Sequence, residues 1–187
     1  ILTGIVFERV GVAASLVTFA QSIIGQRPGG LTLVPVMVCM IMAGMSGSGP
    51  ADAAAVAMVM LPSMTKAGYP RPFSATMIAA SASTAILIPP SIALILYSVM
   101  LPWMDLRALF AAGLFPGILA GISILIPCYL IARLRGWEKG TTEKVERPPF
   151  RKSFIKALPA LFAPVIILGG LRSGLFTPTE AAAVAVA

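Results

Sequence analysis

Apolar runs of unequal length alternate with short polar interruptions along this chain. The runs at residues 31–45 and 50–64 are each about 15 residues long, whereas a helix needs roughly 20 residues to cross the hydrocarbon core of a bilayer. A Gly/Ser-rich segment, Ser46 to Pro50, joins them. Two half-length helices joined by such a tip predict a re-entrant helical hairpin over residues 31–65, which enters and leaves the membrane on one side.

The next apolar run, residues 66–102, is long enough to span, but "SASTAILIPPS" at residues 81–91 interrupts it. Pro89 and Pro90 lack a backbone N–H and disfavour a helix in the residues before them. The pattern therefore predicts a discontinuous transmembrane helix with an unwound middle. Residues 106–132 predict an uninterrupted transmembrane helix.

The two ends of the chain differ from this central part. Residues 1–30 mix small, polar and apolar positions, a pattern typical of an interfacial arm helix and a linker on the membrane surface. Residues 133–153 predict a basic loop, and residues 154–187 predict the start of a second half with two helices, the later one N-capped by Thr177. The chain begins without Met and stops within an apolar pattern, so we expect it to be a fragment of a longer protein.

Composition agrees with an all-α integral membrane protein. The 187 residues are 58% hydrophobic and 11% charged, about half the charge of an ordinary soluble domain, and their mean hydropathy is +0.93. The net charge of +7 does not indicate nucleic-acid binding, because the basic residues gather between 133 and 156. Under the positive-inside rule that stretch is a cytoplasmic loop, and the flanks of the hairpin lie on the same side.

Most enzyme chemistry is disfavoured. The chain contains no His, which removes His-based metal sites and Ser-His-Asp triads as long as these residues are the whole site. Cys39 and Cys128 lie in apolar runs without metal-like spacing. An intramembrane hydrolase with Ser46 or Ser48 as nucleophile stays an alternative, although "GMSG" lacks the histidine base that such an enzyme needs.

The two interruptions carry the functional prediction. Non-helical backbone persists at membrane depth only where it is buried in protein or lines a wet cavity. We expect the hairpin tip, residues 46–50, and the unwound stretch, residues 83–91, to meet near the bilayer middle. Their carbonyls and hydroxyls suit a desolvated cation such as Na⁺, and helix N-termini at Pro50 and Pro90 suit an anionic group. Asp52 could ligate a cation, but an acid in a first helical turn is more typical of a helix cap.

The segment "GMSGSGPADAAAVAMVMLPSMTKAGYPRPFSATMIAASASTAILIPPSIALILYSVM" closely resembles the signature region of one transporter family, the DctM-like large membrane subunits of tripartite ATP-independent periplasmic (TRAP) transporters. The flanking "FAAGLFPGILAG" and "GLFTPTEAAAVAV" are similar to that family too. The resemblance implies an elevator-type transporter of the ion-transporter superfamily, with inverted repeats of which this chain is about the first. It also implies a multi-pass protein of the bacterial cytoplasmic (inner) membrane, coupled to Na⁺ and without an organic cofactor.

The resemblance further implies partners and site residues. The partners would be a small DctQ-like membrane subunit, a periplasmic DctP-like solute-binding protein and a carboxylate substrate such as a C4-dicarboxylate or sialic acid. The candidate sodium site comprises Ser46, Gly47, Ser48, Gly49, Ser83, Thr84, Ile88 and Pro89. The candidate substrate contacts are Ser48, Pro50, Ser83, Pro90 and Ser91. We expect the other half of the site to lie in the second repeat. A sodium/dicarboxylate symporter that needs no binding protein is the alternative transporter.

Overall fold

The computed structural model describes residues 11–24, 29–101, 103–137 and 149–173, and in these ranges the regular elements are helices. In chain order they are α2 (Val12–Ile24), η1 (Gly30–Thr32), α3 (Leu33–Ser46), α4 (Gly49–Lys66), α5 (Arg71–Ala82), η2 (Ser83–Ile86), α6 (Ile92–Met100), α7 (Leu106–Arg135) and α8 (Phe150–Ser173). The all-α prediction is confirmed for this part of the chain.

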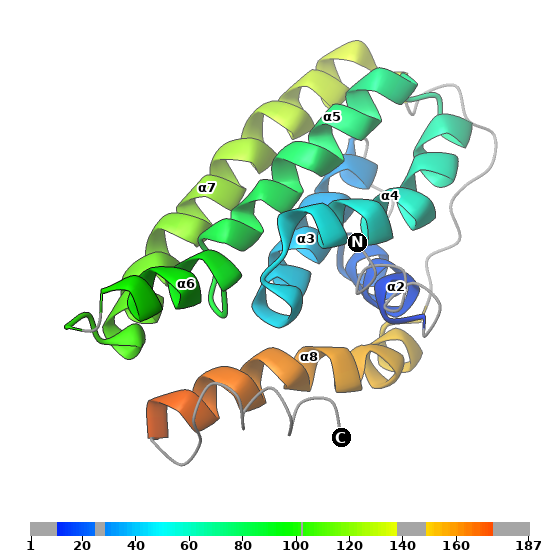
Figure 1. Cartoon of the computed structure of the whole chain (residues 1–187). Helices are drawn as coiled ribbons and strands as arrows, with labels where there is room; N and C mark the ends of the chain where they lie inside the picture. The colour runs from blue at the N-terminus through cyan, green and yellow to red at the C-terminus, as the bar shows by residue number, and fades with distance from the viewer. Residues whose placement is uncertain (1–10, 25–28, 102, 138–148, 174–187) are drawn as a thin grey trace.

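The helices α3 and α4 form a hairpin whose tip is very short (Figure 1). Gly47 ends α3 with a left-handed backbone, φ 57°, and α4 begins at Gly49 with Pro50 in its first turn. Glycine adopts positive φ at little cost, and proline is tolerated where a helix starts. The Gly/Ser/Pro composition of the tip therefore both ends one helix and begins the next.

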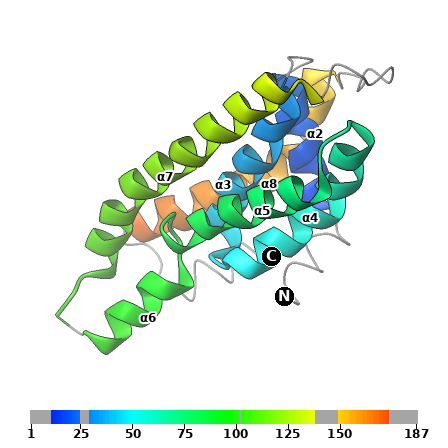
Figure 2. The ribbon, with the colours of Figure 1, turned by 90° about the horizontal axis from the view of Figure 1, so that it is seen from above.

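The helix after the hairpin is broken. After η2, the chain is non-helical until α6 begins at Ile92, and the peptide between Pro89 and Pro90 is cis. The interruption thus coincides with the polar and proline-rich stretch in the sequence. It divides the run into α5 and the short α6, and α7 then returns alongside α5 (Figures 1 and 2).

Among the described helices, α7 is the one whose length and hydropathy suffice to cross a membrane. Asp105 caps its start by accepting a hydrogen bond from the Arg107 amide at 3.0 Å. Much of its apolar surface is exposed, including Phe115 at 74%. A helix that leaves large apolar side chains uncovered is typical of contact with lipid or with further protein.

The basic loop predicted over residues 133–153 is too long at both ends. Arg133 and Arg135 belong to the last turn of α7, and α8 already starts at Phe150. Basic side chains stabilise a helix C-terminus through its dipole, which favours this extension of α7. Residues 138–148 and the helix predicted after Thr177 lie outside the described residues.

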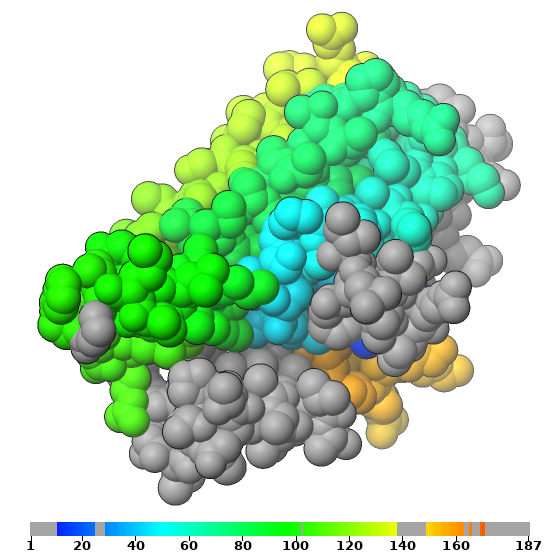
Figure 3. Space-filling model, in the orientation of Figure 1, coloured from blue at the N-terminus to red at the C-terminus, as the bar shows by residue number. Residues whose placement is uncertain are grey.

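The core lies where α2, α3, α4 and α8 pack together. Met42, Met60 and Met64 are fully buried in it, and Phe19 of α2 contacts Phe150 and Phe154 of α8 with ring centroids 6.0 and 5.8 Å apart. The position of α2 on the membrane surface stays a prediction, but its apolar face is covered by protein. Figure 3 shows that α4, α5 and α6 adjoin one another on the face toward the viewer.

Candidate functional site

The hairpin tip and the helix break contact each other through their backbones. The Ile92 amide donates a hydrogen bond to the Gly47 carbonyl at 3.4 Å. A Cβ on Gly47 would lie 2.5 Å from the Pro90 carbonyl oxygen, and one on Gly49 would lie 3.0 Å from that of Ala82. The two interruptions therefore contact each other, and the absence of side chains at both glycines permits the approach. Their place near the bilayer middle stays a prediction.

Ser46, the last residue of α3, is hydrogen-bonded to the first turn of α4. Its hydroxyl donates to Asp52 Oδ1 at 2.5 Å and accepts a hydrogen bond from the Ser48 amide at 3.1 Å. Sequence reasoning missed this bridge, because a serine and an acid six residues apart signal no pairing until the chain reverses between them. The hydrogen bond between Ser46 and Asp52 connects the two helices of the hairpin at its tip.

Asp52 is fully buried, and its Oδ2 has no hydrogen-bond partner. Asp52 does not cap α4 by a hydrogen bond, because its carboxylate accepts from the Ser46 hydroxyl and from no backbone amide. It does lie in the first turn of α4, the position expected of a partner for the helix dipole. No basic side chain in the described part of the chain pairs with it. A buried carboxylate oxygen without a partner is costly unless it is protonated or neutralised by a cation, which makes Asp52 a candidate ligand.

The hydroxyls of the break, and that of Ser81 just before it, all donate hydrogen bonds to nearby backbone carbonyls. Ser81, Ser83, Thr84 and Ser91 each donate to a nearby backbone carbonyl at 2.7 Å. Each hydroxyl oxygen keeps lone pairs that can accept from a ligand or bind a cation. These hydroxyl oxygens therefore stay available as hydrogen-bond acceptors or cation ligands.

The candidate residues of the break differ in exposure. Thr84, Ile88, Pro89 and Ser91 are buried, whereas Ser83 is exposed and Pro90 is half-buried. On the hairpin side, Gly47 and Gly49 are buried, Ser46 and Ser48 are half-buried, and Pro50 is exposed. The structure brings the tip and the buried part of the break together, but it does not bring Ser83 and Pro50 into one enclosed cavity.

One of the two predicted helix N-termini is misplaced. The N-terminus predicted at Pro50 is that of α4, which begins one residue earlier, at Gly49. Ser48 occupies the N-cap position, but its side chain makes no capping hydrogen bond. The second was predicted at Pro90, but α6 begins at Ile92 and Ser91 occupies the N-cap position. Two prolines in succession and the extended backbone of Ser91 delay the restart of the helix.

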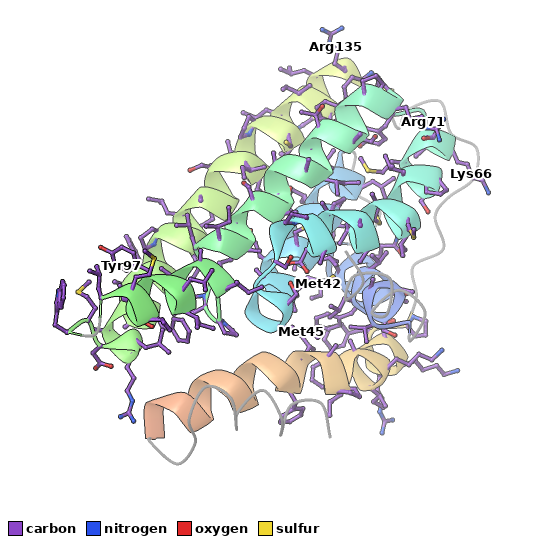
Figure 4. All side chains as sticks on the ribbon, in the orientation of Figure 1. Met42, Met45, Lys66, Arg71, Tyr97 and Arg135 are labelled. Carbon is purple, nitrogen blue, oxygen red and sulfur yellow. The ribbon has the colours of Figure 1, made fainter. Side chains whose placement is uncertain are left out.

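Lys66, Arg71 and Arg135 lie away from this site. Figure 4 shows Lys66, Arg71 and Arg135 at one end of the molecule and Tyr97 near the other, with Met42 and Met45 on α3 between them. Met42 is fully buried and belongs to the core. The methionines of α3 therefore serve as packing side chains.

Two non-helical segments that face each other within an apolar helical bundle define a class of protein, the membrane transporters with discontinuous helices. The family model of the tripartite ATP-independent periplasmic transporter, DctM component, matches residues 1–187. The chain belongs to this family. It is a family of transporter permeases, so the intramembrane hydrolase alternative is wrong.

Curated relatives agree with this assignment. The chain is 40% identical to the C4-dicarboxylate TRAP transporter large permease protein DctM of Pseudomonas aeruginosa, with 99% of this chain and 43% of the relative aligned. It is 40% identical to the 2,3-diketo-L-gulonate permease YiaN of Escherichia coli, with 99% and 43% aligned. It is 39% identical to the sialic acid permease SiaM of Vibrio cholerae, with 98% and 42% aligned. The chain thus spans less than half the length of these relatives.

Proposed function

We propose that this chain forms one half of the transport site of a sodium-coupled secondary transporter that imports an organic acid. The observation that carries the proposal is the contact between the hairpin tip and the helix break, with the unpaired Asp52 oxygen beside it. Such sites bind substrate and ion between half-helices near the bilayer midplane.

The donor set supports sodium as the coupling ion. The candidate ligands from Ser46 to Gly49 and from Ser83 to Pro89 offer backbone carbonyls and hydroxyls, and Asp52 adds a carboxylate oxygen. Hard oxygen ligands suit a hard cation. A sodium ion close to Asp52 would neutralise the charge of its carboxylate and offset the cost of its burial.

The substrate would be an organic acid. The names of the three relatives refer to a C4-dicarboxylate, 2,3-diketo-L-gulonate and sialic acid. No Lys or Arg occurs between Arg27 and Lys66 in this chain. The substrate anion would therefore be held at the hairpin by the amides at the start of α4, by hydroxyls and by the sodium ion itself.

The rest of the transport cycle is part of the same proposal. The second repeat would complete the site, and the whole bundle would carry it across the inner membrane by an elevator motion. A small membrane subunit and a periplasmic binding protein would assemble with it, and the binding protein would deliver the substrate. Because the chain spans less than half of its relatives, these steps belong to the full-length protein.

The experiment uses the full-length permease with its small subunit, reconstituted in liposomes with a C4-dicarboxylate, a diketo-gulonate or sialic acid as radiolabelled probe. Uptake is measured with and without an inward sodium gradient, and with and without the binding protein. The proposal expects uptake only when both are present. Uptake of a probe that persists in potassium alone would overturn sodium coupling.

The same assay separates the alternative transporter. A sodium/dicarboxylate symporter would show sodium-dependent uptake that the binding protein does not increase. Omitting the binding protein at saturating sodium therefore decides between the two. The control is a binding protein whose substrate cleft is mutated so that it no longer binds substrate, which detects nonspecific effects of added protein.

A further inference from the structure

The face of α7 that lies against the helix break carries glycines at four-residue intervals, Gly113, Gly117 and Gly121. Residues four apart share one face of a helix. A methyl group added at Gly113 or Gly117 would meet the helix break, whereas one added at Gly121 would meet a side chain of α3.

At Gly113 and Gly117 the neighbours are Leu87 and Ile88 of the break. A Cβ on Gly113 would lie 2.6 Å from the Leu87 carbonyl oxygen, and one on Gly117 would lie 2.6 Å from Ile88 Cγ1 and 3.1 Å from the Ile88 amide nitrogen. Real Cβ atoms essentially never approach heavy atoms closer than 3.0 Å. The Leu87 carbonyl can therefore occupy its observed place only because Gly113 has no side chain. A methyl group at Gly117 would displace the Ile88 side chain and press on the Ile88 amide.

At Gly121 the neighbour is flexible instead. A Cβ there would meet the end of the Met40 side chain, which belongs to α3 and not to the break. An unbranched thioether can change rotamer to make room. Gly121 is buried on the same helix, so it offers a matched control for the effect of Gly→Ala itself.

The break is held between two glycine contacts. On one side Leu87 and Ile88 lie on Gly113 and Gly117, and on the other Pro90 lies on Gly47. Hydrogen bonds from the Leu87 and Ile88 amides to the Thr84 carbonyl, at 3.0 and 2.9 Å, tie the break to η2. A displacement of Leu87 away from α7 would thus be transmitted to the residues that contact the hairpin tip.

We propose that Gly113 and Gly117 are positioning residues for the transport site, because they set how far the Leu87–Ile88 backbone lies from the hairpin tip. The inference rests on the proposed function, since it assigns the break to the sodium and substrate site. The two glycines bind nothing themselves. They act through the backbone just before Pro89.

The test compares Gly113→Ala and Gly117→Ala with Gly121→Ala in the full-length permease. Gly113→Ala, whose methyl group would meet the Leu87 carbonyl, keeps the proposal testable if Gly117→Ala alone folds poorly.

The first readout is hydrogen–deuterium exchange of peptides that cover residues 83–92, measured on purified protein without transport. We expect exchange about tenfold faster in Gly113→Ala and Gly117→Ala than in the wild type. Gly121→Ala should resemble the wild type. Equal exchange in all variants would overturn the inference.

The second readout is the sodium concentration that gives half-maximal uptake. We expect it to rise about tenfold in the two positioning variants and to stay within about twofold in Gly121→Ala. A general loss of folded protein would lower the maximal rate without this shift. An unchanged sodium requirement in Gly113→Ala and Gly117→Ala would also overturn the inference.

The two readouts separate the inference from the function on which it rests. If wild-type uptake needs no sodium, the proposed coupling fails, while faster exchange confined to Gly113→Ala and Gly117→Ala still supports their positioning role. If wild-type uptake needs sodium but all three alanine variants behave alike, the function stands and the positioning role is wrong.

Discussion

Gly47 combines a left-handed backbone conformation with direct contact to the Pro90 carbonyl. An L-residue in this conformation costs about 1–2 kcal/mol, and the steric contact adds to that cost. The Gly/Ser sequence of the tip predicts a turn here, but not the partner that makes the turn matter. That partner lies about forty residues further along the chain, and only the packing of α5 against the hairpin brings it close.

Replacement of Gly47 separates backbone strain from this contact. We expect Gly47→Ala to lower the initial rate of reconstituted substrate uptake at least about tenfold, because the methyl group would push the break away from the tip. Gly11→Ala is the control, since Gly11 also has positive φ, 79°, but has open space around it. Equal losses in the two variants would show that the contact with Pro90 is unimportant.

Ser46 offers a second test at this scale. Ser46→Ala removes the donor to Asp52 Oδ1, so both carboxylate oxygens would lack a protein partner. We expect the free energy of unfolding to fall by about 1–3 kcal/mol, measured by thermal unfolding of the purified permease. Ser123→Ala is the control, because Ser123 is exposed on α7 and donates to the Leu119 carbonyl. A fall no larger than that of the control would contradict the bridging role.

Among the elements, the turn between α4 and α5 is tied to the end of α7 by aromatic rings. Trp137 contacts Tyr69 and Phe73 with ring centroids 5.3 and 4.7 Å apart. Gly68 precedes them with φ 86°, and a Cβ on it would lie 2.9 Å from the Trp137 carbonyl. The cluster fixes the base of the hairpin and of α5 against α7. It thereby contributes to the position of the site formed by the hairpin tip and the helix break.

Truncation of Trp137 tests this link between elements. We expect Trp137→Ala to lower the free energy of unfolding by about 2 kcal/mol, since two aromatic contacts worth about 0.5–1.5 kcal/mol each are lost. Trp103→Ala should have little effect, because Trp103 is 78% exposed. A similar melting temperature for the two variants would show that the cluster does not hold the elements together.

At the same scale, the sequence predicts where helices break better than how they pack. Prolines 89 and 90 locate the end of η2, because they act on their own backbone and on the residue before. The burial of α2 against α8 could not be predicted, since its mixed pattern suits a membrane surface as well as a protein core. The role of Gly113 and Gly117 was equally hidden, because a glycine row does not reveal its neighbour.

For the whole molecule, the charge distribution predicts orientation in the membrane. Lys66, Arg71 and Arg135 are exposed at one end (Figure 4), and Trp103 lies in the turn before α7, whose far end is Arg135. Under the positive-inside rule we expect the basic end to face the cytoplasm. The site lies between these ends, where its other half would come from residues beyond this chain.

Labelling of single cysteines tests this orientation in intact cells, with Cys39 and Cys128 replaced by alanine. We expect a membrane-impermeant maleimide to label Trp103→Cys from outside, and Lys66→Cys only after permeabilisation. The control blocks both positions with a permeant reagent first. External labelling of Lys66→Cys would contradict the orientation.

The central claim is that the tip and the break together bind sodium, and the most direct measurement is thermal unfolding of the purified full-length permease in NaCl against KCl at equal ionic strength. A ligand that binds the folded state at 100 times its Kd stabilises it by about 2.7 kcal/mol. We predict that NaCl raises the unfolding temperature of the wild type and that Gly47→Ala loses this increase. An equal effect of the two salts on the wild type would contradict the claim.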